Sequence, residues 1–457
     1  MTKTLHGSTD ESEHLARQVI DLVLRRNRDA WPLGGQVAPE VLAQRVGKTI
    51  TSAGLGGEEA LRRWVDELAP ATVAADHPRY FAFIPHAPTE ASVLFDLVVS
   101  GAGLCAASWL EAAGAIYAEN EALRWIADLA GFPAAAGGTF VPGGTLGTLS
   151  ALHAARHAAL VRRQGVRPAR WKLAASIDGH SSIKQAARIM DVDLIEVPVD
   201  GRHRMTGATL RGALDAPGDD GLFAVVASAG GTNLGLIDDL SGVAQVCRER
   251  GAWLHVDGAY GLAALAAPSK RAAFAGIERA DSFTVNPHKW LFAPYDCCAL
   301  VYRDPAQARA AHNQSAAYLD PINDGADWNP ADYALQLSRR ARGLPLWFSL
   351  AVHGTDAYSE AIETTLALTQ QAAEAIRARP FLELLIEPEL SVLVLRRRGW
   401  SAADYDAWSA HLIASGAGFV VPTTFQGEPA VRIVIIDPRK THADIERVLD
   451  AMKDAPR

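Results

Sequence analysis

Lys289 stands in a stretch whose residue types favour an unusual amine. The segment 281–291 reads Asp-Ser-Phe-Thr-Val-Asn-Pro-His-Lys-Trp-Leu, and Phe292 follows it. Apolar neighbours disfavour the charged ammonium of a lysine, and so does His288 if its imidazole is protonated. A neutral amine is a nucleophile that adds to an aldehyde to form a Schiff base. Taken alone, the pattern also fits, and rather favours, an ordinary lysine that extends its amine from a loop end into water.

A carboxylate 32 residues upstream gives this lysine a chemical partner. The run Trp253-Leu254-His255-Val256-Asp257 is typical of a short buried strand that ends on an acid, and the small residues Gly258 and Ala259 follow. Such a carboxylate can keep a pyridinium nitrogen protonated, as the electron-accepting ring of pyridoxal phosphate requires. Asp257 alone could equally cap a helix in an ordinary strand-to-helix turn. The pair Asp257 and Lys289 is much more specific than either residue.

Six motifs in order extend this interpretation to most of the chain. They are His77-Pro78-Arg79-Tyr80-Phe81, Gly143-Gly144-Thr145, His180-Ser181-Ser182, Gly231-Thr232-Asn233, His255-Val256-Asp257 and Asn286-Pro287-His288-Lys289-Trp290. Through them the chain, from about His77 to the C-terminus, resembles the group II pyridoxal-phosphate decarboxylases. That family includes aromatic-L-amino-acid, histidine, tyrosine and glutamate decarboxylases. The resemblance implies the aspartate-aminotransferase-like α/β fold (fold type I), the cofactor pyridoxal 5′-phosphate, and a homodimer with its active site at the subunit interface.

Composition excludes several other classes of protein. The 457 residues carry a net charge of −8, which gives no basic footprint for nucleic acid or anionic lipid. The four cysteines form no disulfide framework or metal-ligand spacing, so we expect no metal and a cytoplasmic location. The N-terminus lacks the apolar core of a signal peptide. The longest apolar run, 91–109, contains Asp96 and two glycines and is expected to form a buried helix with a loop rather than a membrane span.

The pattern along the chain predicts three parts. Residues 12–68 show helical periodicity and predict a helical N-terminal arm (1–75), which in the resembled family packs across the dimer partner. Between 139 and 303, helical segments alternate with short runs rich in β-forming residues, which predicts a mostly parallel sheet with helices on both faces in a large domain (76–350). Helices are expected at 111–131, 149–160, 339–378 and from His442 onward. Strands near 391–395 and 431–436 predict a small α+β domain (351–457).

The motifs supply residues for the cofactor. Glycines at the start of a helix expose backbone N–H groups, so Gly144 and Thr145 are assigned to the phosphate. The resemblance adds Asn286 and His288 at the phosphate and His180 stacked on the ring, and we place Thr232 and Ala259 beside the ring. Without the other motifs, His180 would be a helix-start residue capped by Ser181. Leu146 and Gly231 depart from the family, which usually has a polar residue and a threonine at these positions.

The residues assigned to the substrate are inferred mainly from the family resemblance. Tyr318 matches the family's loop tyrosine, which protonates the carbanion left after carbon dioxide departs; a surface tyrosine without a role is the alternative. The family's substrate pocket corresponds to Phe83, Ile84, His86, Cys105 and Ala107, with the last two on a loop from the partner subunit. Smaller residues at 105 and 107 favour a roomier pocket, and His86 adds a polar group. Arg432 corresponds to an arginine that orients the lid or a carboxylate, unless it forms a structural ion pair.

These residues predict a decarboxylase of an aromatic or apolar L-amino acid, with Lys289, Asp257, His180 and Tyr318 as the catalytic residues. An aldehyde synthase or a carbon–carbon lyase could use the same site, although Tyr318 favours simple decarboxylation because related aldehyde-forming enzymes have phenylalanine there. A non-catalytic relative that keeps the fold for binding or assembly is the alternative of a different class. The intact set of lysine, aspartate and histidine argues against it.

Overall fold

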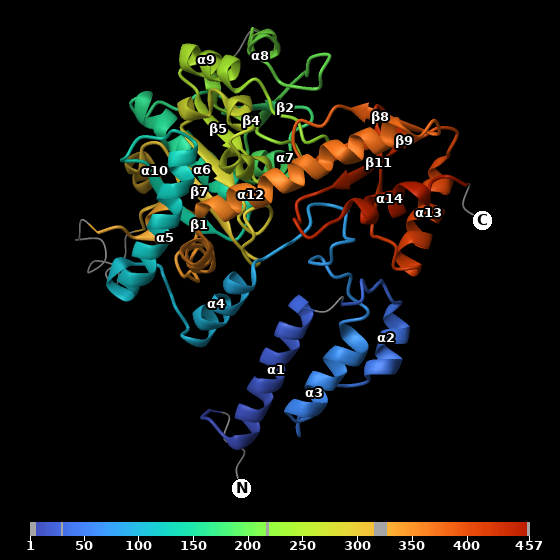
Figure 1. The fold of residues 1–457 in the computed structure, drawn as a ribbon. Helices are drawn as coiled ribbons and strands as arrows, with labels where there is room; N and C mark the ends of the chain where they lie inside the picture. The colour runs from blue at the N-terminus through green and yellow to red at the C-terminus, as the bar shows by residue number, and fades with distance from the viewer. Residues whose placement is uncertain (1–5, 29–30, 216–218, 315–326, 455–457) are drawn as a thin grey trace.

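The computed structural model describes residues 6–28, 31–215, 219–314 and 327–454. Three short helices begin the chain, a seven-stranded sheet with its helices forms the centre, and a four-stranded sheet with two helices ends it (Figure 1). The long helix α12 (Leu344–Arg377) runs from the central part to the C-terminal part. The backbone of α12 is not helical at Gly354, so residue 350, the expected boundary between the large and small domains, lies just before a break in this helix. No helix among the described residues is long and apolar enough to cross a membrane.

The large sheet has the order β1-β7-β6-β5-β4-β2-β3. Neighbours from β6 to β3 are parallel, whereas β7 is antiparallel to both β1 and β6. The prediction of a mostly parallel α/β sheet is therefore confirmed, and the antiparallel β7 is the strand that the sequence did not indicate. The strands are β1 (Gly137–Val141), β2 (Lys172–Ser176), β3 (Asp193–Val197), β4 (Leu222–Ser228), β5 (Trp253–Asp257), β6 (Ser282–Val285) and β7 (Cys298–Tyr302).

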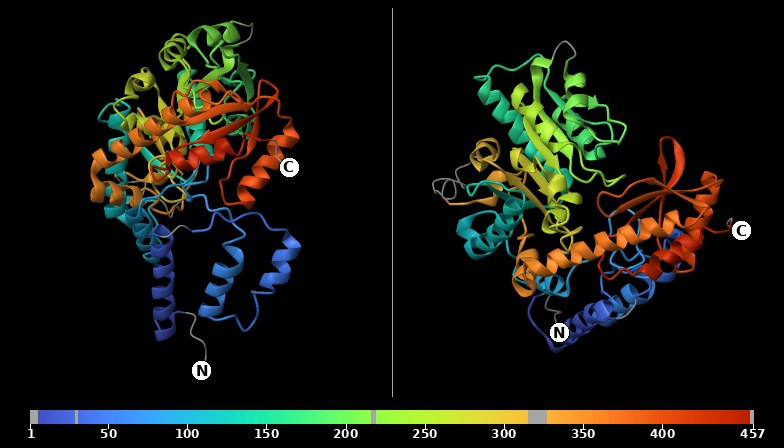
Figure 2. Two further views of the ribbon diagram at one scale, coloured as in Figure 1. Left: turned by 45° about the vertical axis from the view of Figure 1, so that its right-hand side comes forward. Right: turned by 45° about the horizontal axis from the view of Figure 1, so that its top comes forward.

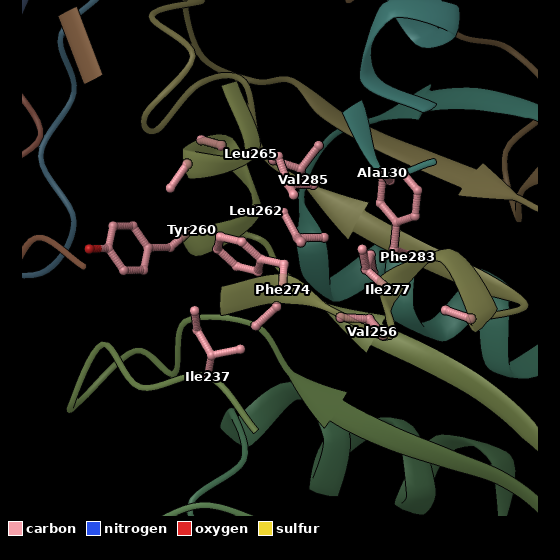
Figure 3. Close-up of a cluster of buried hydrophobic side chains, with 14 of the residues drawn as sticks. Ala130, Ile237, Val256, Tyr260, Leu262, Leu265, Phe274, Ile277, Phe283 and Val285 are labelled. Atoms are coloured by element: carbon pink, nitrogen blue, oxygen red, sulfur yellow. The ribbon is translucent and has the colours of Figure 1, made fainter. Parts of the chain in front are cut away.

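Both faces of this sheet are buried under helices, which explains why its strands are continuous apolar runs. Alternate residues of a strand point to opposite faces, so in β5 Trp253 packs in one core whereas Leu254 and Val256 pack in the other. Figure 3 shows part of the second core, to which Val256 and Phe283 contribute from neighbouring strands and Tyr260 from the loop after β5. The helices are α4 (Glu90–Gly101), α5 (Trp109–Leu129), α6 (Gly144–Arg162), α7 (Ser181–Met190), α8 (Gly207–Leu214), α9 (Leu240–Arg250) and α10 (Pro305–His312), and short helices are η2 (Asp219–Gly221), η3 (Gly261–Ala266), η4 (Arg271–Phe274), η5 (Ile277–Arg279) and η7 (Pro330–Tyr333).

The C-terminal part is an antiparallel sheet of order β10-β11-β9-β8 backed by helices. Its core contains Tyr405 and Trp408, which are fully buried. This part has more strands than the two that the sequence indicated, and its terminal helix begins at His442 as expected. The elements are β8 (Leu382–Ile386), β9 (Val392–Arg397), α13 (Ala402–Ala414), β10 (Pro422–Phe425), β11 (Glu428–Val434) and α14 (His442–Asp450).

The N-terminal helices lie at one side of the molecule, apart from the large sheet (Figures 1 and 2). They are α1 (Asp10–Arg28), α2 (Pro39–Val46), α3 (Gly57–Arg63) and the π-helical turn η1 (Trp64–Leu68). Arg26 ties this region to the rest of the chain through a two-bond ion pair with Asp76. Helical structure was expected here, and none of the residues of α2, α3 or η1 is buried.

Two sequence-based expectations about helices were wrong in detail. The helix expected from Leu149 begins at Gly144, because Gly144 and Thr145 are already helical, whereas Gly143 is extended and caps the helix. The apolar run 91–109 does form a helix and a loop, but in a single chain the helix is not buried: Leu94, Leu97 and Val98 are exposed and only Ser92 and Val99 are buried. Apolar periodicity identifies a face that avoids water and does not say which chain covers it.

Candidate active site

Strands β2, β4, β5 and β6 are parallel neighbours, so their carboxyl ends lie side by side along one end of the sheet. The loops that follow them carry the predicted cofactor residues, and the start of α6 reaches the same end. Such an end is where α/β sheets bind ligands. One pocket there is lined by Gly144, Thr145, His180, Ser182, Ser228, Gly230, Gly231, Thr232, Asp257, Ala259, Tyr260, Asn286 and Lys289.

Lys289 reaches this pocket from a tight turn after β6. The Asn286 N–H donates to the Ala259 carbonyl at 2.9 Å, and the Lys289 N–H donates to the Asn286 carbonyl at 2.9 Å. These bonds lock the loop after β6 onto the loop after β5. Burial lowers the pKa of the Lys289 amine, and the nearby guanidinium of Arg432 lowers it further, while Asp257 opposes the shift. The surroundings therefore shift Lys289 toward the neutral, nucleophilic form of the amine, in the direction that the sequence analysis expected.

His288 is a neutral imidazole rather than the imidazolium that the sequence analysis considered. Its Nδ1 accepts a hydrogen bond from the Cys297 N–H at 2.9 Å, and burial lowers the pKa of its imidazole to about 3. His288 is thus neutral at physiological pH, and the idea that an imidazolium beside Lys289 depresses the amine was wrong. Desolvation of Lys289 is the main cause. Because Nδ1 accepts, the proton of neutral His288 sits on Nε2, which lies 3.3 Å from the amide nitrogen of Asn286.

Asp257 ends β5 and is oriented by its own loop. Its Oδ1 accepts the Ala259 N–H at 3.1 Å. The next helix, η3, starts only at Gly261 and has Tyr260 at its cap position, so Asp257 is not a helix cap. Asp257 and Lys289 both line the pocket, and Ala259 lies between Asp257 and the start of α6. This is the arrangement that a flat ring needs when it has an electron-accepting nitrogen at one end.

The other end of the pocket fits a phosphate. Helix α6 starts at Gly144 with Gly143 as its cap, and no side chain caps it, so its first N–H groups are left for a ligand. A Cβ atom at Gly144 would lie 3.2 Å from the Ala259 Cβ and 3.4 Å from the Asn286 Oδ1, which leaves little room for a larger residue. The buried Asn286 Oδ1 has no hydrogen-bond partner within the described residues. If the amide is turned over, that oxygen can accept from His288 Nε2 and its NH₂ faces the uncapped end.

His180 also lines the pocket and is held by a helix start. It caps α7 itself: its Nδ1 accepts from the Ser182 N–H at 3.2 Å and lies 2.8 Å from the Ser182 Oγ. His180 is therefore a helix-start residue, as the alternative for it supposed, but the histidine itself makes the capping bond and Ser181 does not. Because Nδ1 is an acceptor, a neutral His180 carries its proton on Nε2. The capping bond fixes the plane of an exposed imidazole at the pocket wall.

Arg432 on β11 is the unusual charge near this pocket. It is 8% exposed, and its Nε and Nη2 have no hydrogen-bond partner among the described residues. Burial lowers its pKa to about 10, a shift that Tyr260 opposes. The structural ion pair that the sequence left open does not form within the described chain. An unpaired buried guanidinium is costly unless something anionic binds to it.

The other predicted substrate residues do not line the Lys289 pocket within one chain. Phe83 and Cys105 are exposed, and Ile84 and Ala107 are buried. His86 approaches most closely, since its Nδ1 lies 3.0 Å from the His288 carbonyl. Tyr318 lies outside the described residues, so its role as proton donor stays a prediction.

Several residues of this region were missed by the sequence analysis. Ser228 and Tyr260 line the pocket, and Ser228 could have been found because it is the last residue of β4. Tyr295 stacks on His86 with 4.3 Å between ring centroids and also lies against His288. No motif marks Tyr295, because its stacking partner His86 lies 209 positions earlier in the chain.

The fold and pocket define a pyridoxal-phosphate enzyme with an α/β architecture. Residues 58–398 match the model of the pyridoxal-dependent decarboxylase conserved domain. The chain is 26% identical to aromatic-L-amino-acid decarboxylase of Bacillus atrophaeus, over 99% of this chain and 97% of that protein. It is 30% identical to L-2,4-diaminobutyrate decarboxylase of Rhizobium meliloti, over 99% of this chain and 94% of that protein. The crystal structure of Oryza sativa TDC with PLP and tryptamine superposes with a TM-score of 0.92 at 22% identity, covering 99% of this chain and 100% of that one.

The chain belongs to the pyridoxal-dependent decarboxylase family. It is therefore a carboxy-lyase that uses pyridoxal phosphate, and the resemblance inferred from the six motifs is confirmed. The relatives act on different amino acids, so family membership leaves the substrate open.

Proposed function

We propose that this enzyme decarboxylates an aromatic or apolar L-amino acid to the corresponding amine and carbon dioxide. The observation that carries the proposal is the meeting of Lys289, Asp257 and His180 in one pocket, with the unpaired guanidinium of Arg432 close by. Lysine and aspartate serve the cofactor, whereas Arg432 supplies a positive charge that nothing in the described chain uses. The α-carboxylate of an amino acid is the anion that every substrate of such an enzyme carries.

Each residue then has a definite task. When bound, pyridoxal phosphate supplies an electron sink. The neutral amine of Lys289 would hold its aldehyde carbon until the substrate amine takes that place, and Asp257 would hold a proton on the ring nitrogen. His180, fixed by Ser182, would cover one face of the ring. Arg432 would orient the substrate carboxylate, and positioning of this kind contributes much of an enzyme's rate enhancement.

Tyr318 would complete the reaction by giving a proton to the α-carbon. This part of the proposal rests on the family resemblance and on the position of Tyr318 before Arg339 in the sequence. A tyrosine there supports release of an amine rather than an aldehyde.

An aromatic cluster beside the lysine loop supports an aromatic or apolar side chain in the substrate. Phe83 lies against Phe419 with ring centroids 6.2 Å apart, and Tyr80 lies against the same ring at 5.0 Å. His86 and Tyr295 form a stacked pair that touches the lysine loop at His288. Burial lowers the pKa of His86, so this pair adds no positive charge for an acidic side chain. The cluster offers flat, neutral surfaces.

The test is a panel of amino acids assayed for released carbon dioxide with the cofactor-loaded enzyme. Phenylalanine, tyrosine and tryptophan are expected to give higher kcat/KM than glutamate, histidine and 2,4-diaminobutyrate, with amine and carbon dioxide formed in equal amounts. A preference for diaminobutyrate or glutamate would contradict the substrate assignment. Aldehyde and peroxide in place of amine would contradict the reaction.

We also propose that the enzyme is a homodimer in which residues 1–75 pack across the partner. Exposed apolar side chains on α4 and α5 support this, including Leu97 at 55% and Leu110 at 72% exposure. Apolar patches of this kind mark contact surfaces. The loop between α4 and α5 carries the exposed Cys105, which would then reach the partner's pocket.

Subunit mixing tests the shared site. Lys289→Ala removes the essential amine, and Cys105→Trp would fill the partner's pocket, so each homodimer should be inactive. Mixed dimers contain one site with neither substitution, and random exchange should restore about a quarter of the normal activity. No recovery after demonstrated subunit exchange would contradict a shared site. The cytoplasmic location remains a proposal as well, supported by the four thiols, none of which forms a disulfide.

A further inference from the structure

A second pocket lies beside the later turns of α6 and the end of α7 and has a cationic lining. Its volume is about 410 Å³, a size suited to a small organic ligand. His153, Arg156 and His157 line it from the later turns of α6, and Arg167 and Trp171 line it from the following loop. Gly144 and His157 are 13 residues apart on one helix, or about 20 Å. The second pocket is thus separate from the cofactor's phosphate end.

The local sequence concentrates positive charge at this place. Residues 156–172 contain six lysines and arginines and no aspartate or glutamate, in a chain whose net charge is −8. The acid that lines the pocket is Asp191, and Arg170 already holds it through bonds of 2.9 and 3.1 Å. Arg170 also bonds Asp193 at 2.9 Å. Arg170 is therefore neutralised within the protein, whereas the other arginines of the pocket are not.

Arg156 and Arg167 face the pocket without an acidic partner in the described part of the chain. Arg156 makes one bond, from Nη1 to the Met190 carbonyl at 3.0 Å, which holds its guanidinium at the pocket wall. Burial lowers the pKa of Arg156, and the charge of Arg167 lowers it further. The charges of Arg156 and Arg167 repel each other at the wall of this pocket, and an anion bound between them would relieve that repulsion.

We propose that this pocket binds a phosphate-bearing organic anion of about the size of a nucleotide. The arginines would take the phosphate, since guanidinium groups match phosphate oxygens with paired N–H donors. His153 lines the same pocket, and its ring is held by a bond that Nε2 donates to the Ala311 carbonyl at 3.0 Å. Leu160, Trp171 and Met190 add an apolar wall for the organic part of the ligand. Arg156 and Arg167 converge on one hollow of limited volume rather than along an extended stripe, which favours a small molecule over a nucleic acid.

The experiment measures binding to the cofactor-loaded enzyme, in which the phosphate end of the active site is occupied. Isothermal titration at low ionic strength would use pyrophosphate, AMP and adenosine as probes. Pyrophosphate and AMP are each expected to bind at one site per chain, with an affinity that falls as the salt concentration is raised. Adenosine, which has no phosphate, is not expected to bind. Equal binding of adenosine would show that phosphate is not recognised, and loss of the cofactor's visible absorbance on titration would place the anion in the active site. Either result overturns the proposal.

Matched variants locate the site. Arg167→Gln removes an exposed charge from a loop, so this variant should fold normally. It is expected to weaken AMP binding about tenfold or more, and Arg156→Gln should have the same effect. Arg447→Gln on α14 makes the same change of charge far away and should leave the affinity unchanged. Unaltered AMP affinity in Arg167→Gln, or no binding of either phosphate probe to the unsubstituted enzyme, would overturn the assignment. These measurements need no turnover, so they are independent of the substrate proposal.

Discussion

Replacing Arg432 by methionine should move stability and activity in opposite directions. The side chain is 8% exposed, and burial lowers its pKa from 12.5 to about 10. That difference corresponds to about 3 kcal/mol by which the folded, substrate-free enzyme disfavours the charge. Methionine fills a similar volume without the charge, so Arg432→Met should raise the free energy of unfolding by up to about 3 kcal/mol.

The same substitution should damage the reaction. Removing one member of a desolvated charge pair usually costs about 2–5 kcal/mol, which corresponds to a fall in kcat/KM of roughly 30-fold or more. Arg432→Lys keeps a charge but loses the paired donors, so it should recover part of the activity. The assays are denaturant unfolding of the cofactor-loaded enzyme at a fixed protein concentration and release of carbon dioxide. A variant that is less stable but as active as the unsubstituted enzyme would refute the role given to Arg432.

Arg339 provides a control with equal burial and the opposite expectation. It donates to both oxygens of Glu119 at 2.7 and 2.8 Å, and both side chains are 2% exposed. It also donates to the Ala106 carbonyl at 2.7 Å. Arg339→Met leaves Glu119 charged and buried, so it should lower stability by about 3–5 kcal/mol. If both arginine variants change stability in the same direction, pairing is not what distinguishes the two sites.

Three further outcomes follow from the cofactor pocket and from the loop tyrosine. Lys289→Ala should keep the far-ultraviolet circular dichroism of the folded enzyme but lose the borohydride-reducible link to the cofactor; a variant that still forms this link would remove Lys289 from its role. Asp257→Ala should retain cofactor through the start of α6 and lose roughly 100-fold or more in kcat, and near-normal turnover would contradict its place at the ring nitrogen. Tyr318→Phe should lower the yield of amine and raise aldehyde and peroxide from the same amino acid, and an unchanged amine yield without peroxide would assign the proton to another group.

The sequence by itself predicted which residues meet at the proposed cofactor end of the pocket. Asp257, Asn286 and Lys289 are each fixed by a short motif at the end of a strand, and the strands are recognisable because burial on both faces makes them continuous apolar runs. Parallel neighbours bring their carboxyl ends to one end of the sheet, so local patterns were enough to place these residues together. The glycines at 143 and 144 likewise indicated a phosphate site at a helix start, although only the structure placed that start at Gly144 and showed that no side chain caps it.

Only the tertiary structure decided the charges and contacts that depend on distant parts of the chain. That Arg432 lacks a partner could not be read from its neighbours in sequence, because its surroundings are built from β11 and the loop after β5. His288 is neutral because packing buries it, although its sequence position suggested an imidazolium. The exposed face of α4 has the same apolar pattern as a buried helix, and only the folded chain shows it uncovered. Burial and pairing arise from non-local packing, whereas periodicity and turn chemistry are local, and this difference separates what the sequence specified from what the fold added.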